Sequence, residues 1–392
     1  MKVIVAQIGA RRRYLVAKIL ANESMLEALY TDSSNYSFLG KMAKKCNFKT
    51  GRLGRLAKRI INDIPINLVQ STDKLVISDV SSKLILKASQ KHKLSKHEVF
   101  SKVLINWGCR NADAVYAMQD ESHEFLLYAK AKGLKIILDT CVTPLALRKV
   151  RDRQRRFQGW ESEISDREIS KFEHQFLRNL KIADLILCPS KVVAEDVKLL
   201  SRTPDNRLKI VPYGSSITLG NNNPIIGNVL FVGSGDVRKG IHVISKVAEM
   251  ARKNNKKFDF RIVGEVDDKI INKAESRCLN FMGKLSKDEL IKEYGKADVF
   301  IFPTCAEGLA GSVLEALAHG LPIITTKASG LLIKDKVEGI YIDEDNVDAL
   351  FLEICNLIEN RNFRNTIANN AKQRFDYYTI ESYSTRLIEA IK

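Results

Sequence analysis

The sequence predicts an α/β protein with two doubly wound parallel sheets that face a central cleft. Short apolar segments typical of strands alternate with helical segments along the whole chain, which is the pattern of parallel sheets with crossover helices. The 392 residues exceed one typical core and suit two domains of roughly 190 residues each. A stretch rich in Gly, Ser and Asn marks the boundary, so we expect domains over residues 1–214 and 228–375, a linker over 215–227 and a C-terminal helix over 376–392.

The individual elements follow from local patterns in the order of the chain. Strands of the first domain are expected at Lys2–Ile8, Ala28–Thr31, Ala114–Met118, Leu134–Asp139, Leu185–Cys188 and Lys209–Val211. Strands of the second domain are expected at Val229–Val232, Phe258–Val263, Leu279–Met282, Val299–Phe302, Ile323–Thr325 and Ile340–Ile342. Helical periodicity predicts helices at Arg12–Ala21, His123–Ala131, Asp152–Ile182, Lys191–Leu200, Gly240–Lys253, Lys287–Tyr294 and Glu381–Lys392. Ligands of such sheets bind at the carboxyl ends of the strands.

The composition argues against a membrane-spanning protein, a secreted protein and a metal-binding protein. The chain is 45% apolar and has no apolar run of the length that spans a bilayer. Its start, MKVIVAQIGARRR, reads as a first strand and not as a signal peptide. Its seven cysteines are scattered singly without metal-ligand or disulfide spacing, so we expect a reducing cytoplasmic location and no bound metal.

The basic charge is concentrated near the N-terminus. Of the net charge of +17, residues 1–100 carry +12, and Lys41–Arg59 holds eight basic residues and no acidic one. Leucines and isoleucines follow at near-helical spacing, a pattern typical of an anionic membrane surface or of a solvated helix face. Interleaved aromatic residues and nucleic-acid-binding signatures are missing, so we expect no nucleic-acid partner.

The segment Pro303–Ile324, PTCAEGLAGSVLEALAHGLPII, carries the strongest chemical signal. A predicted strand feeds a Gly-containing turn that opens a helix, and such a turn presents backbone amides to an anion. Glu307 lies in the turn and Glu315 in the first turns of the helix. Carboxylates repel phosphate but accept hydrogen bonds from hydroxyl groups. A ligand with both a phosphate and hydroxyl groups, such as a nucleotide sugar, fits this combination.

A second turn, Gly233–Gly240, has the sequence GSGDVRKG between a predicted strand and helix. Its glycines allow close approach of a ligand to the backbone, and Arg238 and Lys239 can neutralise a diphosphate. The turn does not match the P-loop pattern G-x-x-x-x-G-K-[ST].

These motifs together resemble the retaining glycosyltransferases of the GT-B fold, of the glycosyltransferase family 4 type. Pro303–Ile324 resembles their E-x7-E signature, and four further segments follow the family's order. These segments are NVLFVGSGDVRKGIH (228–242), FRIVG (260–264), FMGKLSKDELIKEYGKADVFIFPT (281–304) and VEGIYID (337–343). Many family members have an arginine at the position of Ser234, and Arg238 is expected to supply this guanidinium. The resemblance also implies a C-terminal helix that crosses back to the first domain.

The resemblance assigns a role to each matching residue. Lys239 and Arg238 would hold the donor diphosphate, Glu315 the ribose, and Glu307 the donor sugar, with Glu307, Arg238 and Lys239 as the catalytic group. The amides of Gly308–Ala310 would grip the sugar and its phosphate, and Gly264 and Gly283–Leu285 would pass near the base. The implied donor-binding set is Gly233, Ser234, Arg238, Lys239, Gly264, Gly283, Lys284, Leu285, Glu307, Gly308, Leu309, Ala310 and Glu315. Because the basic pair Arg238 and Lys239 can take the place of a metal ion at the diphosphate, no metal or other cofactor is expected.

The loop after the first strand, GARRRY, is where the family places its acceptor side. Gly9, Arg11, Arg12 and Arg13 are therefore candidate contacts to an acceptor phosphate, and a basic helix start is the alternative. The sequence thus predicts a cytoplasmic glycosyltransferase on the inner face of the membrane, acting on a saccharide or lipid-linked acceptor in bacterial surface polysaccharide synthesis. A nucleotide-sugar epimerase or hydrolase of the same fold, or a non-catalytic sugar-nucleotide-binding protein, remains the alternative.

Overall fold

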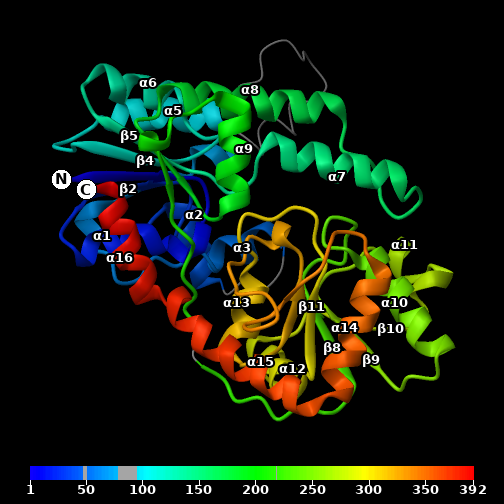
Figure 1. The fold of residues 1–392 in the computed structure, drawn as a ribbon. Coiled ribbons are helices and arrows are strands. Elements are labelled where there is room, and N and C mark those ends of the chain that lie inside the picture. The colour runs from blue at the N-terminus through cyan, green and yellow to red at the C-terminus, as the bar shows by residue number, and fades with distance from the viewer. Residues whose placement is uncertain (47–50, 78–94, 218) are drawn as a thin grey trace.

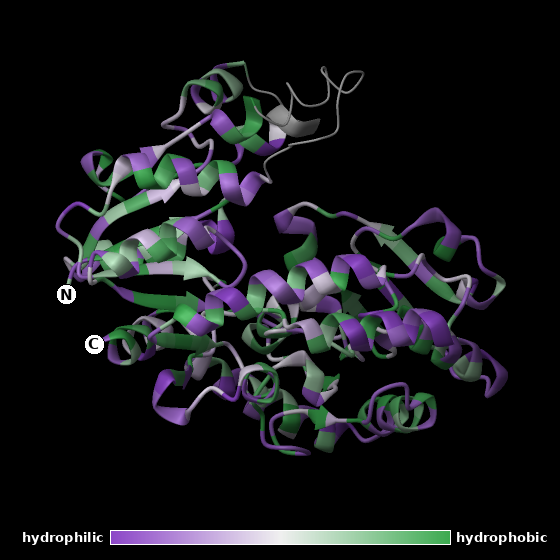
Figure 2. Cartoon of the chain, turned by 90° about the horizontal axis from the view of Figure 1, so that it is seen from above, coloured by the Kyte–Doolittle hydropathy of each residue, from purple (hydrophilic) through white to green (hydrophobic). Residues whose placement is uncertain are grey.

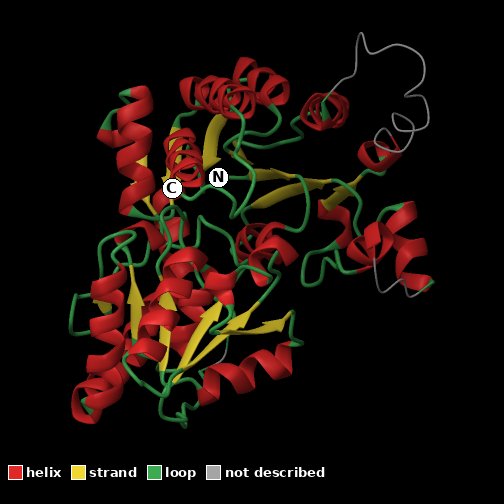
Figure 3. Ribbon diagram, turned by 90° about the vertical axis from the view of Figure 1, so that its right-hand side faces the viewer, coloured by secondary structure: helices red, strands yellow, loops and turns green. Residues whose placement is uncertain are grey.

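A computed structural model describes residues 1–46, 51–77, 95–217 and 219–392. The chain forms two α/β units, each with a parallel sheet between helices (Figure 1). Figure 3 shows the two sheets as separate groups of strands with helices on their outer faces. The α/β fold with two doubly wound parallel sheets, predicted from alternating strand and helix patterns, is confirmed.

The first sheet has seven strands in the order β3-β2-β1-β4-β5-β6-β7. The strands are β1 Val3–Gln7, β2 Leu26–Thr31, β3 Val69–Ser71, β4 Ala114–Met118, β5 Lys135–Asp139, β6 Leu185–Cys188 and β7 Leu208–Ile210. The helices are α1 Leu15–Asn22, α2 Phe38–Lys45, α3 Gly51–Ala57, α5 Lys96–Trp107, α6 His123–Ala131, α7 Pro144–Arg156, α8 Asp166–Ile182 and α9 Lys191–Ser201. All adjacent strands pair in parallel.

The side chains of β1 point alternately to the two faces of the first sheet, and both faces are covered by helices. Val3 and Val5 pack with α1, whereas Ile4 and Ala6 belong to a separate apolar cluster with α5, α6, α8 and α9. Successive side chains of a strand point to opposite faces, so a strand that is apolar at every position needs a helical layer on each side. Figure 2 shows the resulting apolar strands between helices of mixed polarity.

The second sheet has six strands in the order β10-β9-β8-β11-β12-β13. The strands are β8 Asn228–Val232, β9 Asp259–Val263, β10 Leu279–Gly283, β11 Val299–Phe302, β12 Ile323–Thr325 and β13 Ile340–Tyr341. The helices are α10 Ile241–Lys253, α11 Asp268–Ile271, α12 Lys287–Lys296, α13 Gly311–Ala318, α14 Val347–Glu359 and α15 Arg361–Arg374. The strand order reverses between β8 and β11, and this switch point is where doubly wound sheets open a ligand crevice.

The last helix, α16 Ile380–Ile391, packs on the first sheet. Its buried residues Tyr383, Leu387, Ile388 and Ile391 share an apolar cluster with β1 and α1. In Figure 1 the red C-terminal helix lies beside α1 and ends near the N-terminus. The chain therefore passes from the first domain to the second and returns.

Three local predictions differ from the structure. The edge strand β3 was not predicted, because its three half-buried residues give little periodic signal. The single helix predicted over Asp152–Ile182 is wrong, since α7 ends at Arg156 and α8 begins at Asp166, with Gly159 in a left-handed conformation between them. The helix predicted from Arg12 begins at Leu15 instead, because Arg12, Arg13 and Tyr14 all have positive φ.

The left-handed turn at Arg12 brings this residue to the two segments by which the chain leaves the first domain and returns to it. Its guanidinium forms an ion pair with the buried carboxylate of Asp139 and donates to the Tyr383 hydroxyl at 2.9 Å. It also lies 3.5 Å from the centroid of the Tyr213 ring, in the segment that leaves the first domain. Asp139 additionally accepts hydrogen bonds from the hydroxyls of Tyr116 and Tyr213. Arg12 therefore serves the scaffold, and an acceptor contact is not assigned to it.

We expect Arg12→Met to destabilise the protein by about 3 kcal/mol, because it leaves the Asp139 carboxylate buried without its counter-ion. Urea unfolding measures this change. Arg13→Met is the matched control, because Arg13 is exposed and adjacent. Equal stability of the two variants would contradict a structural role for the Arg12 ion pair.

Candidate functional site

The β8–α10 loop, Gly233–Gly240, is ordered by one carboxylate. Asp236 accepts a hydrogen bond from the Ser234 hydroxyl at 2.6 Å and from the Lys239 amide at 2.9 Å. Gly240 begins α10 with φ +84°, and a Cβ there would lie 2.4 Å from the carbonyl oxygen of Pro303. The loop is thus held close to the end of β11, and only glycine fits at its last position.

Arg238 joins this loop to the β11–α13 loop, Pro303–Ala310. Its carbonyl oxygen accepts from the Cys305 amide at 2.8 Å and from the Thr304 hydroxyl at 3.0 Å. Its guanidinium forms an ion pair with Glu307 and donates to the Ala306 carbonyl at 3.1 Å. The three residues predicted to form the catalytic group, Glu307, Arg238 and Lys239, are therefore brought together at the switch point.

Lys239 extends back across its own loop. A Cβ on Gly233 would lie 2.8 Å from the Lys239 Nζ, so the ammonium group occupies the space that glycine leaves open. Nζ also lies 5.8 Å from the centroid of the Phe302 ring. Burial lowers the pKa of Lys239, and the charge of Arg238 acts in the same direction, whereas Glu307 and Asp236 oppose the shift. An anion placed beside Lys239 would favour its charged form.

The start of α13 offers backbone amides. Its N-cap residue, Ala310, provides no capping side chain. The amides of Glu307 and Ala310 donate to the carbonyls of Ala328 and Ser329, at 2.9 and 3.1 Å. Within the described residues, the amides of Gly308 and Leu309 donate to no protein acceptor. Of the three amides predicted to grip the ligand, those of the buried residues Gly308 and Leu309 are therefore without a protein acceptor, and that of Ala310 is used internally.

Glu315 lies on α13 and is held by a buried tyrosine that the sequence analysis did not identify. The Tyr294 hydroxyl donates to the Glu315 carboxylate at 2.8 Å. Burial, reinforced by Glu315, raises the pKa of Tyr294 well above its ordinary value, so the phenol stays protonated as a donor. The Tyr294 ring also stacks on His319, with centroids 5.0 Å apart. No local motif pairs Tyr294 with Glu315, because the contact forms between two helices.

The residues predicted to lie near a base surround an open depression of about 280 Å³. Gly264, Gly283 and Lys284 line it, together with Glu265, Val266, Ile271 and Phe281. A Cβ on Gly264 would lie 2.0 Å from the Gly233 carbonyl oxygen, so this glycine lets the end of β9 approach the β8–α10 loop. The Lys284 ammonium pairs with Glu265 at 2.5 Å, and Leu285 packs on the core of the second domain.

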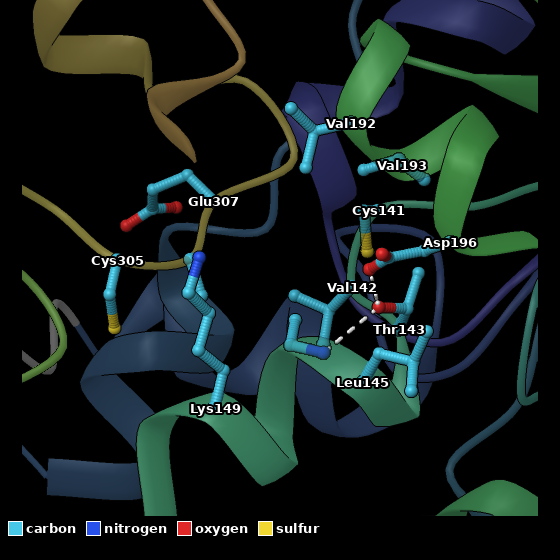
Figure 4. A pocket seen from close by; sticks show the side chains of 12 residues that line it. Cys141, Val142, Thr143, Leu145, Lys149, Val192, Val193, Asp196, Cys305 and Glu307 are labelled. Atoms are coloured by element: carbon cyan, nitrogen blue, oxygen red, sulfur yellow. Dashed lines mark hydrogen bonds between the residues drawn. The ribbon is translucent and has the colours of Figure 1, made fainter. Parts of the chain in front are cut away.

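A cavity of about 100 Å³ connects Glu307 with the first domain (Figure 4). Its walls come from the ends of β5, β6 and β11 and include Thr143, Asp196 and Lys149. A Cβ on Gly308 would lie 2.3 Å from the Cys141 carbonyl oxygen, so the two domains touch beside the cavity. Burial raises the pKa of the Cys141 and Cys305 thiols to about 11, which keeps both protonated and unsuited to nucleophilic attack.

The predicted acceptor-side residues all follow β1, and the nearby Glu121 follows the neighbouring strand β4. Arg11 pairs with the buried Glu121 at 2.9 Å, and 40% of its side chain is exposed. Burial raises the pKa of Glu121 to about 7, against the opposing effect of Arg11. The Gly9 amide donates to Asp32 at 2.8 Å, and Asp32 pairs with Arg59 from the basic segment.

The basic segment Lys41–Arg59 is described only in part, since residues 47–50 lie outside the described residues. Helices α2 and α3 cover the remainder. Throughout the described ranges, no group of three or more His, Cys, Asp or Glu side chains could hold a metal ion. None of the helices in those ranges is long and apolar enough to cross a bilayer.

Comparison with known proteins finds similarity to glycosyltransferases. Residues 225–374 match the sequence family described as glycosyl transferases group 1. An uncharacterized glycosyltransferase of Methanocaldococcus jannaschii is 29% identical over 226 residues, covering 51% of this chain and 56% of the relative. The N,N'-diacetylbacillosaminyl-diphospho-undecaprenol alpha-1,3-N-acetylgalactosaminyltransferase of Campylobacter jejuni is 24% identical over 211 residues, covering 52% of this chain and 54% of the relative. The chain thus spans about half the length of these relatives.

The fold of the whole chain is also known. The crystal structure of HepE from Anabaena in complex with UDP superposes with a TM-score of 0.67, covering 100% of this chain and 99% of that chain at 13% identity. This likeness concerns the fold, which in this chain consists of two α/β domains. Residues 225–374 are therefore similar to the group 1 glycosyl transferases, and the chain as a whole has the two-domain α/β fold.

Proposed function

We propose that the chain transfers a sugar from a nucleotide-diphosphate sugar to an acceptor hydroxyl, with retention of the anomeric configuration. The observation that carries this proposal is the convergence of Arg238, Lys239 and the amides of Gly308 and Leu309, which have no protein acceptor in the described residues, at one strand switch point. Cations and amides in this arrangement suit a diphosphate, while Glu307 and Glu315 suit hydroxyl groups on either side of it. The depression beside Gly264 offers room for the base.

The chemistry assigned to these residues is stabilisation of the leaving group. As the bond between the sugar's anomeric carbon and the diphosphate oxygen breaks, the oxygen keeps the electron pair, and negative charge develops beside Lys239 and Arg238. Fixed positive charges and amides lower the energy of that state more than they lower the energy of the bound donor. The acceptor hydroxyl forms the new bond to the anomeric carbon and gives up its proton to the departing phosphate. Retention rests on the family resemblance of the E-x7-E segment.

Donor binding requires an exchange of partners at Arg238. Its guanidinium neutralises Glu307, whose side chain is only 16% exposed. A diphosphate would compete for the guanidinium and leave Glu307 to accept hydrogen bonds from sugar hydroxyls. The same pair thus keeps the site electrostatically balanced and releases a carboxylate when an anion arrives.

The proposal predicts metal-independent turnover that depends on Lys239. With excess EDTA present, we expect the chain to release nucleoside diphosphate from one of a panel of UDP, GDP and ADP sugars in the presence of extracted bacterial lipids. Lys239→Ala should lower this rate by about 100-fold, as removal of one donor to a developing oxyanion does. Lys253→Ala on α10 is the control, since its side chain is 63% exposed.

Analysis of the products separates this function from its alternatives. Unaltered turnover in Lys239→Ala, or complete loss in EDTA that Mg²⁺ restores, would contradict the site assignment. A free sugar or an epimerised nucleotide sugar as the only product would favour the hydrolase or epimerase of the same fold. Binding of a sugar nucleotide without any turnover would favour a non-catalytic protein.

We propose a saccharide or lipid-linked saccharide as the acceptor, within bacterial surface polysaccharide synthesis. The name of the Campylobacter relative describes a lipid-diphosphate acceptor, and here Arg11 and Arg13 are exposed in the loop that follows β1, which we propose as the acceptor side. The Arg11 guanidinium is partly exposed and is held in place by the buried Glu121, so it is available to a phosphate group.

We further propose that the chain acts in the cytoplasm, bound peripherally to the inner face of the membrane. Helix α2 exposes 70% of Phe38 and 48% of Met42 beside Lys41, Lys44 and Lys45. Exposed apolar side chains flanked by lysines are typical of helices that lie in the interface of an anionic bilayer.

Replacing both exposed apolar residues, Phe38→Ser with Met42→Ser, should weaken binding to phosphatidylglycerol-containing vesicles by roughly 10-fold, because the apolar contact with the bilayer is lost. Vesicle sedimentation measures the change. Leu199→Ser on α9, where the leucine is 76% exposed, is the matched control. Equal binding by all three proteins would contradict this surface as the membrane contact.

A further inference from the structure

The segment Phe157–Ile164, which we call the strap, connects α7 and α8 of the first domain but packs on the second. Trp160 is 6% exposed and belongs to the apolar core cluster of the second domain. The ring of Phe157 lies 4.0 Å from that of His242 on α10, centroid to centroid. The ammonium groups of Lys246 and Lys273 lie 5.2 Å from the rings of Phe157 and Trp160, respectively. The strap is therefore anchored to the domain that carries the proposed donor site.

Ion pairs from α7 strengthen this anchor. Arg153, whose side chain is 5% exposed, pairs with Asp345 at 2.9 Å and with Glu344 at 3.3 Å. Arg156 pairs with Asp345 at 3.2 Å, and Lys149 pairs with Glu344. Both carboxylates follow β13 of the second domain. In Figure 1 the turn between α7 and α8 reaches over the second domain near α10 and α11.

A chain of hydrogen bonds runs from the strap to the β8–α10 loop. The Ile164 amide donates to the Gln154 side-chain oxygen at 2.9 Å, and the Gln154 side-chain nitrogen donates to Glu161 at 2.8 Å. The other oxygen of Glu161 accepts from the Val237 amide at 3.4 Å. Val237 is fully buried and directly precedes Arg238 and Lys239. Glu161 is thus a residue of the first domain that holds the backbone of the loop carrying the basic pair.

We propose that Glu161 is a positioning residue for the donor diphosphate, and that the strap makes the geometry of the β8–α10 loop depend on contact between the two domains. The loop has its own internal support in Asp236, which fixes Ser234 and the Lys239 amide. Among the hydrogen bonds of the described residues, Glu161 is the acceptor of the Val237 amide, and it is the residue of the first domain that bonds to this loop. This inference rests on the proposed function. It adds that contact between the domains, through Glu161, affects the affinity of the site for the donor diphosphate.

The direction of each hydrogen bond allows a sharp test. A glutamine side chain has one acceptor oxygen, so Glu161→Gln can satisfy either the Val237 amide or Gln154, but not both. The exchanged pair, Gln154→Glu with Glu161→Gln, restores every bond. Its carboxylate at position 154 can accept from the Ile164 amide and from the side-chain nitrogen at position 161, while the side-chain oxygen at position 161 accepts from the Val237 amide. Side-chain size is conserved throughout, so a defect of packing would not be rescued by the exchange.

We expect Glu161→Gln to weaken UDP, GDP or ADP binding, whichever the wild-type chain binds, by about 5-fold in calorimetric titration. The exchanged pair should bind within about 2-fold of the wild type. Thermal unfolding of each variant checks that it is folded. Unchanged affinity in Glu161→Gln would overturn the inference, as would an equal loss in the exchanged pair. If the wild-type chain binds none of the three nucleotides, the proposed function itself fails.

Trp160 supplies an independent readout, because the chain has two tryptophans. In a Trp107→Phe background, nucleotide binding should change the fluorescence of Trp160, and Glu161→Gln should reduce that change. A Trp160 signal that does not respond to a nucleotide that binds would overturn the coupling of the strap to the donor site.

Discussion

The main-chain carbonyl of Arg238 is the point on which the architecture of the site depends. It accepts hydrogen bonds from both Cys305 and Thr304, and so fixes the end of β8 against the end of β11. Parallel strands bring their carboxyl ends to one edge of a sheet, but the fold alone does not bring two loops into contact. Here the close approach also needs Gly240 against Pro303 and Gly264 against Gly233, where a side chain would clash with backbone. The basic pair and Glu307 acquire their arrangement from these backbone contacts.

The two domains are linked by more than the connecting segments. Arg12 ties the first strand loop to Asp139, Tyr213 and Tyr383, and so joins both places where the chain passes between domains. On the other side of the cleft, the strap carries Trp160 into the core of the second domain. The cavity beside Glu307 has walls from both domains. A site built in this way responds to the relative placement of the domains, because each side supplies part of it.

The sequence was sufficient for the fold class and for most of the strands, because buried parallel strands are continuous apolar runs and their glycine-containing turns recur at the strand ends. The motif residues Arg238, Lys239, Glu307 and Glu315 could be singled out because each lies within one short segment. Contacts between distant segments could not be predicted in this way. Tyr294 meets Glu315, and Glu161 meets Val237, through packing of elements that are remote in sequence. The same limit holds for Arg12: the sequence offered an acceptor contact or a basic helix start, and could not show that a left-handed turn directs this arginine toward the buried Asp139.

The most direct test of the central claim is calorimetric titration with UDP, GDP and ADP as a function of pH. Burial lowers the pKa of Lys239 in the free protein, and a bound diphosphate would raise it again, so binding should take up a proton. The account predicts that one nucleotide binds, that its affinity falls as the pH rises from about 7 to 10, and that Lys239→Arg removes most of this dependence. Absence of binding by all three nucleotides, or an affinity that rises with pH, would contradict a diphosphate site at Lys239.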